Sequence, residues 1–439
     1  MFKTLANAFK EKDIRNKILL IIGLVLVYRL GCWIPVPGIN PSEFSSQVSG
    51  GFLELLSSVS GGALANASIL ALGISPYISA SIIVQLLTIA IPYLERLSKL
   101  GDEGRKKIAT ITKYVALVLA IAQAVAVVIS FESILKTTYG VAGHTVELPV
   151  WVMGIFVVCI LVGGSMFTYN LGEKITEIGI GNGQSLLIFV GILSTAATSL
   201  LGSFTTIFAG GDDAFDALIE LIIFVIALIV IFAFIVFMDG AERKVKVQYA
   251  KQIRGRKMYG GQDTYIPIRV NSTGVMPIIF AMSLLSFPQL IMSIFMDTTT
   301  NGFYLWYSEF LGTGSVAYII ITGLLILFFS YFWTQVTFNP DDISRNIQQN
   351  GGCIPTVRPG KPTAEYLRRI SNRITLFGAI FLGIMAIVPS LVFSGIGSGT
   401  LVGAFSATGL LIVVSVAIEF NKALEAQLLM KNYRGFLNR

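Results

Sequence analysis

The chain has 439 residues, of which 13% are charged, whereas charged residues make up roughly 25% of typical soluble domains. Apolar residues reach 54%, so a soluble protein of this length could not cover its surface with the few charges available, and the composition indicates an integral membrane protein. A single histidine and three widely separated cysteines leave no metal cluster and no histidine-based triad to assemble, which argues against most hydrolytic and metal chemistry.

Residues 1–17 are predicted to form an amphipathic helix on the cytoplasmic membrane surface, because Phe2, Leu5 and Phe9 share one helical face. A cleaved signal peptide is the alternative interpretation. It is disfavoured because the following apolar stretch is long for a signal core and leads into residues 35–38 without a small-x-small cleavage pattern.

Ten segments are apolar enough to be membrane-spanning helices, each of which needs about 20 mostly apolar residues. The sixth is the clearest, because no charge interrupts residues 221–238, and the second and fifth are the weakest, because Ser, Gly, Pro and Gln interrupt them. The predicted spans are 18–34, 75–94, 114–131, 150–169, 182–202, 217–238, 274–296, 314–336, 374–391 and 403–420.

The placement of the basic residues predicts the orientation of these spans. With the N-terminus in the cytoplasm, 30 of the 32 Lys and Arg residues fall in cytoplasmic segments, so both termini are predicted to lie inside, with 421–439 as a cytoplasmic tail. Five spans lie in residues 18–216 and five in residues 217–420. A second half of matching fold would therefore be inverted, an arrangement found in many transport proteins.

Residues 50–74 are moderately apolar and rich in Gly and Ser, too polar to face lipid as a stable span. Irregular backbone at membrane depth is tolerated only where it is buried in protein or lines a water-filled cavity. We therefore expect a short re-entrant element here, with an ordinary extracytoplasmic loop as the alternative.

Charged residues are almost absent from the predicted spans, whereas ion-coupled transporters usually keep some at mid-membrane for the coupling chemistry. Arg29 is the main exception, and its side chain is expected to extend outward to the membrane surface. The interrupted spans offer isoleucines, and an apolar constriction in a pore resists water and ions by dewetting. Each isoleucine alone is more simply explained by ordinary packing. These residues are Ile74, Ile78, Ile188, Ile279 and Ile412.

Two predicted cytoplasmic loops, 239–273 and 337–373, are long and basic. Alternating apolar residues on both sides of a double glycine predict that the first loop forms a protruding hairpin. The positive-inside rule alone could account for the charges. The size of the loops and the hairpin pattern nevertheless favour docking of a large cytoplasmic partner. The basic residues would also suit a partner whose surface is RNA.

Several runs of the chain, ordered between residues 29 and 420, resemble the SecY family, the channel subunits of bacterial protein translocases. The runs are 34–39 (IPVPGI), 60–64 (SGGAL), 71–87 (ALGISPYISASIIVQLL), 104–107 (GRKK), 178–183 (IGIGNG), 338–340 (FNP) and 358–360 (RPG). The resemblance implies two five-span halves around an hourglass-shaped pore, closed on the extracytoplasmic side by a plug helix near residues 57–68.

The resemblance also implies roles for individual residues. The family's pore is narrowed by a ring of apolar side chains, and one of the six matching positions here is the polar Gln184. This departure suggests either a leakier constriction or greater reliance on the plug. The plug residues would be Ser57, Ser60, Gly61, Gly62, Ala63, Leu64 and Asn66. The pore ring would be Ile74, Ile78, Gln184, Ile188, Ile279 and Ile412.

Spans two and seven resemble the family's lateral gate, through which a signal sequence passes into membrane lipid, and Gln85 and Asn182 resemble members of its polar cluster. The implied partners are the small membrane subunits SecE and SecG, the motor ATPase SecA, the ribosome and precursor proteins that carry signal peptides. The residues that resemble the docking positions for SecA or the ribosome are Arg254, Arg256, Lys257, Arg358, Pro359 and Gly360.

The expected function is a passive, gated protein-conducting channel in the bacterial plasma membrane. The chain carries no ATPase motif, and no cofactor or metal is implied, so it is expected not to be an enzyme. Energy would come from SecA, the translating ribosome and the membrane potential. A secondary solute transporter with inverted repeats is the alternative. It is motivated by the topology and the broken spans, and the missing coupling charges argue against it.

Overall fold

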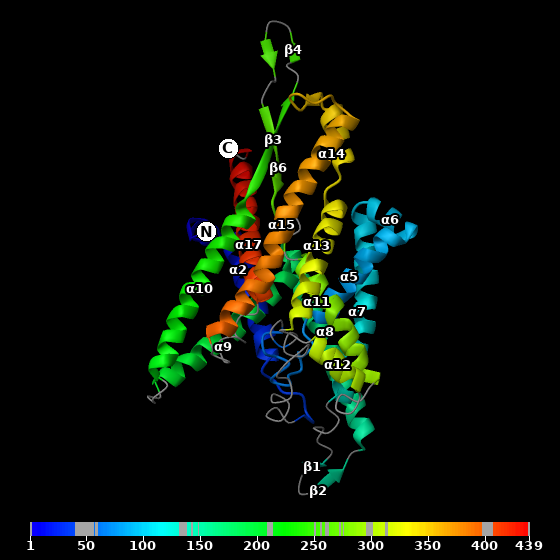
Figure 1. Cartoon of the computed structure of the whole chain (residues 1–439), viewed down its shortest axis with the longest axis vertical. Coiled ribbons are helices and arrows are strands. Elements are labelled where there is room, and N and C mark those ends of the chain that lie inside the picture. Colours follow the sequence, from blue (N-terminus) through cyan, green and yellow to red (C-terminus); the bar gives the residue numbers. More distant parts are fainter. Residues whose placement is uncertain are drawn as a thin grey trace. The chain divides into compact units, whose positions relative to one another are not determined.

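A computed structural model gives the fold of the chain (Figure 1). It describes residues 2–39, 57, 60–130, 138–141, 144–147, 149–208, 214–249, 252–254, 257–259, 263–271, 274, 276–295, 302–311, 315–396 and 407–437. The chain divides into two compact units, each discontinuous in sequence. The first comprises Met1–Leu221, Ser283–Ser315 and Gly397–Arg439, and the second comprises Ile222–Met282 and Val316–Ile396.

Helices dominate both units, which confirms the predicted all-α membrane fold. Two helices, α10 (Ala214–Gly240) and α11 (Met276–Phe295), run from one unit into the other. The other helices of the first unit are α1 (Phe2–Lys10), α2 (Lys12–Gly31), α5 (Ser75–Ala90), α6 (Pro92–Lys99), α7 (Asp102–Ser130), α8 (Val150–Ile178), α9 (Gly183–Phe208), α12 (Gly302–Phe310) and α17 (Ala407–Leu437). The others of the second unit are α13 (Val316–Thr337), α14 (Pro340–Gln349) and α15 (Lys361–Ile396).

Each of the ten predicted spans overlaps a helix, although the second span extends beyond its helix into α6. The helices concerned are α2, α5, α7, α8, α9, α10, α11, α13, α15 and α17. Within the described part of the chain, six helices are long and apolar enough to cross a membrane by length and composition, and the bent pair of α5 and α6 would make a seventh. The long, apolar segments therefore predicted the helices well.

The second predicted span differs from the expectation, because residues 75–94 do not form one straight helix. Helix α5 ends at Ala90, and α6 begins at Pro92 after a bend of 105°. A proline disfavours the α conformation of the residue before it, and Ile91 accordingly lies in the extended region, with φ −105° and ψ 114°.

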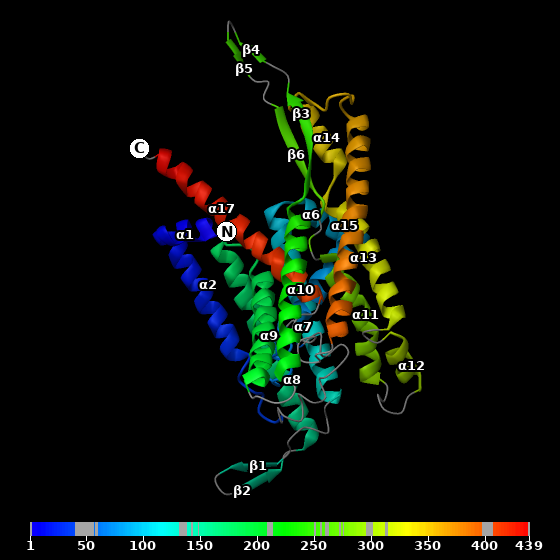
Figure 2. The same ribbon diagram turned by 60° about the vertical axis from the view of Figure 1, so that its left-hand side comes forward.

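The second unit contains the predicted hairpin (Figure 2). Strands β3 (Glu242–Tyr249) and β6 (Asp263–Arg269) pair antiparallel, and the short strand β7 (Gly352–Cys353) pairs with the other edge of β3. Val245 and Val247 alternate with polar residues and pack with Ile268, Ile347 and Leu367 in a buried core. Period-two alternation thus places one face of the hairpin on α14 and α15.

Two further pairs of short strands lie in connecting segments, one in each unit. The strands β4 (Gln252–Arg254) and β5 (Lys257–Tyr259) form a second antiparallel pair, drawn at the far tip of the β3–β6 hairpin in Figure 2. In the first unit, β1 (Thr138–Val141) pairs with β2 (His144–Glu147) between α7 and α8. Sequence analysis did not predict the β1–β2 hairpin.

Candidate functional site

Residues 60–74 of the first unit, the continuous described part of the predicted re-entrant element, fold into consecutive turns. The backbone amide of Asn66 donates to the carbonyl of Gly62 at 3.0 Å, and that of Ser68 donates to Ala63 at 3.0 Å. Leu64 and Leu72 are 0% and 1% exposed and belong to a core that includes residues of α7 and α8. The segment is therefore buried in protein, as expected for a re-entrant element and unlike an ordinary exposed loop. Residues 58 and 59 of the predicted plug lie outside the described residues.

The chain that follows α2 holds the 60–74 segment through its backbone. The amide of Val36 donates to the carbonyl of Ala67 at 2.8 Å, and the amide of Ile69 donates to the carbonyl of Ile34 at 3.0 Å. These two bonds flank a β-bridge between Pro35 and Ser68. Backbone bonds of this kind satisfy polar groups that have no water available inside a membrane protein.

Helix α8 supports the far end of the same segment at very close range. The hydroxyl of Ser165 donates to the carbonyl of Gly73 at 3.1 Å. One residue earlier, Gly164 leaves no room for a side chain, since a Cβ there would lie 2.0 Å from the carbonyl oxygen of Ile69. The 60–74 segment can approach α8 this closely only because glycine occupies position 164.

The expectation for Arg29 was wrong. Its guanidinium is hydrogen-bonded to two partners within the protein. Nη1 donates to the carbonyl of Gly61 at 3.1 Å, and Nη2 donates to the hydroxyl of Ser194 on α9. Beside it, the hydroxyl of Tyr28 donates to the carbonyl of Ser60 at 3.3 Å. The physical reason is that a backbone carbonyl and a hydroxyl accept hydrogen bonds from the guanidinium inside the protein. These bonds replace hydrogen bonds to water at the membrane surface.

Five of the six predicted ring residues lie on four helices, and the sixth lies just before one of them. Ile74 immediately precedes α5 and Ile78 lies one turn later, Gln184 and Ile188 are one turn apart on α9, Ile412 lies on α17, and Ile279 lies on α11 in the second unit. Ile74, Ile188 and Ile412 are buried, while Ile78, Gln184 and Ile279 are half-buried. Helix α17 packs against α9. The first unit thus holds five of the six predicted members, and their role as a ring stays a prediction.

The two residues of the predicted gate cluster have different environments. Gln85 is half-buried on α5. Asn182 is exposed at the start of α9, where its side-chain oxygen accepts a hydrogen bond from the amide of Gln184 at 3.0 Å. This bond is a helix N-cap, which satisfies an amide that has no partner within the helix. Asn182 therefore has a structural role that sequence analysis missed, beside the predicted one.

The predicted docking residues lie in the second unit. Arg254 and Lys257 pair directly across β4 and β5, and Arg256 lies outside the described residues. Arg358 and Pro359 are exposed in the turn before α15. The carbonyl of Gly360 accepts bonds from the hydroxyl of Ser344 at 2.7 Å and the amide of Thr363 at 3.0 Å, and Thr363 Oγ1 donates to the carbonyl of Arg358 at 2.8 Å. These bonds hold the turn in place and leave the Arg358 side chain at the surface.

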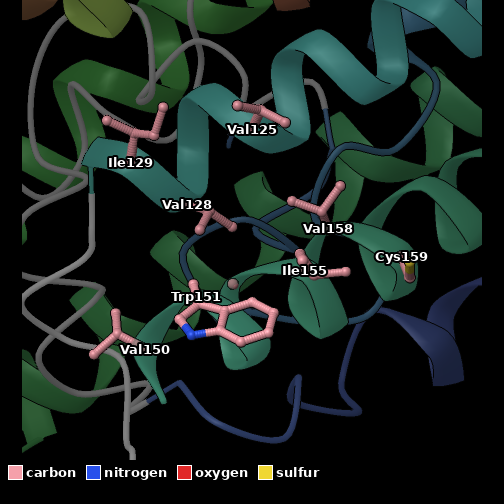
Figure 3. A pocket seen from close by; sticks show the side chains of 9 residues that line it. Val125, Val128, Ile129, Val150, Trp151, Ile155, Val158 and Cys159 are labelled. Carbon is pink, nitrogen blue, oxygen red and sulfur yellow. The ribbon is translucent and has the colours of Figure 1, made fainter.

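Two of the cavities formed by described residues differ in character. An apolar cavity of about 560 Å³ lies between α7 and α8, where Trp151, Val128 and Ile155 point toward it (Figure 3). A cavity of about 400 Å³ beside α14 is polar and contains the ion pair between Arg368 and Asp341, at 2.8 Å. No group of three or more His, Cys, Asp or Glu side chains that could hold a metal is found among the residues searched, which are the described ones.

Comparisons with known proteins agree with this architecture. A SecY family model matches residues 68–421. The protein translocase subunit SecY of Streptomyces coelicolor is 41% identical over 445 aligned positions that cover all of both chains. A solved structure of a protein-conducting channel matches with a TM-score of 0.66 at 20% identity, over 92% of this chain and 90% of that one. Sec61 from a canine ribosome–channel complex matches with a TM-score of 0.62 at 19% identity, over 92% and 90%. On its sequence and its fold, the chain belongs to the SecY family.

Proposed function

We propose that the chain is the channel subunit of a bacterial protein translocase, a passive gated pore through which unfolded secretory proteins cross the plasma membrane. The observation that carries this proposal is the 41% identity to a translocase subunit over the whole of both chains. The scarcity of charge in the spans supports it, because a conduit for chains of many sequences needs no charged coupling site.

In this proposal, residues 57–68 act as the plug, and a ring of six residues forms the constriction. Isoleucine side chains would exclude water and ions by dewetting and still yield to a passing chain. Gln184 is the polar member, so the plug would carry more of the seal. The ring members are Ile74, Ile78, Gln184, Ile188, Ile279 and Ile412.

We further propose that spans two and seven form a lateral gate for signal sequences and membrane helices. Gln85 and Asn182 would supply part of its polar seam, and an apolar signal helix would replace their hydrogen bonds with apolar contacts. The relevant helices are α5 and α11.

The partners that supply energy would bind to the two basic loops of the second unit. Arg254, Arg256, Lys257 and the exposed turn at residues 358–360 offer positive charge to SecA or to the phosphates of ribosomal RNA. Small SecE-like and SecG-like subunits would complete the complex. Both termini would be cytoplasmic, since 30 of 32 basic residues then face the cytoplasm.

Reconstitution tests the proposal. Vesicles that contain the chain with SecE-like and SecG-like partners, and that are supplied with SecA and ATP, should protect a signal-bearing precursor from external protease. A precursor with a charge inserted in its apolar signal core is the matched control, and vesicles without the chain are a second one. Ion-coupled, saturable uptake of a small solute without precursor import would support the transporter alternative instead.

A further inference from the structure

Arg29 is the one basic side chain of the first predicted span, and the structure gives it a specific pair of partners. Its two terminal nitrogens reach in different directions. One bonds the carbonyl of Gly61 in the 60–74 segment, and the other bonds the hydroxyl of Ser194 on α9. A guanidinium has several donors in a fixed planar fork, so it can hold two acceptors at once in a defined geometry.

The contact with Arg29 requires a glycine at position 61. Gly61 has φ +71°, a conformation that residues with a side chain rarely adopt. A Cβ at this position would lie 2.6 Å from Arg29 Nη1 and 2.7 Å from the Cα of Gly191 on α9. Gly61 is thus inserted between Arg29 and α9, and no larger residue fits there.

A second bond from the same end of α2 reaches the neighbouring residue. The hydroxyl of Tyr28, which is buried, donates to the carbonyl of Ser60. Both acceptors in the segment are backbone carbonyls, so the contact does not depend on the side chains of residues 60 and 61. The Ser60 hydroxyl in turn donates to the carbonyl of Ser57 at 3.1 Å, which extends the held region to the start of the proposed plug.

We infer that Arg29 is a latch, a positioning residue that holds the plug closed by joining the carbonyl of Gly61 to Ser194 of α9, with Tyr28 as an auxiliary bond. This inference rests on the proposed function, because it assigns a task to a segment that acts as a plug only in a channel. Displacement of the plug breaks the bond to Gly61 but leaves the bond to Ser194, so the cation keeps one partner in the open state.

The test measures exposure of the plug directly. Ala63 is 0% exposed, so Ala63→Cys reports opening by its reaction with a membrane-impermeant maleimide added on the extracytoplasmic side. The three native cysteines, Cys32, Cys159 and Cys353, are replaced by serine in every variant. Labelling of a buried thiol in rapid exchange follows the population of the open form.

In the reconstituted complex without precursor, Arg29→Met should raise the Ala63→Cys labelling rate by about 10- to 100-fold, the range expected when a hydrogen bond from a charged donor is lost. Arg29→Lys should give an intermediate rate, because an ammonium cannot reproduce the two-way fork. Arg15→Met, on the exposed surface of the same helix, is the matched control and should leave the rate unchanged.

Equal labelling in Arg29→Met and the parent would overturn the latch, even if precursor import by the parent succeeds. If Arg29→Met does not accumulate, Arg29→Lys and Tyr28→Phe decide. Faster labelling in both supports the latch, and parental rates in both overturn it. Failure of the parent to import precursor would count against the proposed function alone, because the labelling assay uses no precursor.

Discussion

At the scale of single residues, small side chains decide how closely the 60–74 segment approaches its neighbours. Gly164 of α8 faces the carbonyl of Ile69, and Gly31 of α2 faces Leu70, whose nearest atom would lie 2.5 Å from a Cβ at position 31. The side chain of Leu70 could move, but the backbone at Ile69 is held by its bond to Ile34. Gly164 is therefore the less replaceable of the two.

Gly164→Ala should lower the free energy of unfolding by about 1–3 kcal/mol, the usual result of forcing extra volume into a packed site. Its added Cβ would meet a backbone oxygen at 2.0 Å, which nothing short of a backbone shift relieves. Thermal unfolding of the purified complex in detergent measures the effect. Gly163→Ala is the control on the preceding residue, where a Cβ meets nothing within 4 Å. Equal melting temperatures for the two variants would contradict the packing described for Gly164.

The residue contacts were the part least accessible to sequence analysis. The sequence predicts that the Arg29 side chain extends outward, because a lone basic residue within a span usually reaches toward water. Its partners are a backbone carbonyl 32 residues away and a serine 165 residues away, and neither leaves a pattern in the sequence. The isoleucines proposed for the ring were likewise indistinguishable from packing residues until the family resemblance grouped them.

At the scale of elements, packing and hydrogen bonds of the second unit support the two loops that we propose as docking sites. Val245 and Val247 anchor β3 in a buried core, and the turn at residues 358–360 is fixed by bonds from Ser344 and Thr363. A rigid support reduces the conformational entropy lost when a partner binds. The exposed Arg358 is therefore well placed to contribute to docking.

Arg358→Glu should reduce SecA-driven precursor import by roughly tenfold, because a reversed charge at a docking surface weakens encounter and binding. Thermal stability should be unchanged, since the Arg358 side chain is exposed. Import kinetics and a melting curve on the same preparation check both parts. Arg105→Glu, an exposed reversal on α7, is the control for a general loss of positive charge. Normal import by Arg358→Glu would move the docking site elsewhere.

Elements with a clear period were predictable, and irregular ones were not. The alternation on either side of Gly260-Gly261 predicted the β3–β6 hairpin, because a strand with one buried face repeats every two residues. Strand β7 has only 2 residues, too few to show a period, and it forms because α14 and α15 bring it to the edge of β3. Pro92 is a sequence signal for the break after Ala90. It was not used, because the apolar run continues on both sides of this proline and resembles a single span.

At the scale of the whole molecule, the distribution of charge is the property from which the membrane class and the orientation of the chain were inferred. Thirty of 32 basic residues fall in the predicted cytoplasmic segments, and the ten predicted spans all overlap helices. Composition and hydropathy thus gave the fold class and the elements. They could not give the burial of the 60–74 segment, because that depends on α8 and α9, which lie about a hundred residues further along the chain.

Passage of a polypeptide through this chain can be detected by crosslinking. A secretory precursor that carries one cysteine is stalled in transit through a channel chain without native cysteines, into which a single cysteine is introduced at Ile78, Ile188 or Ile412, and a mild oxidant is added. We expect disulfide crosslinks from the stalled precursor to all three positions. Ile155→Cys, on the exposed surface of α8, serves as the control and should give none. Crosslinks to the control position but to none of the three proposed ring positions would contradict passage through this pore.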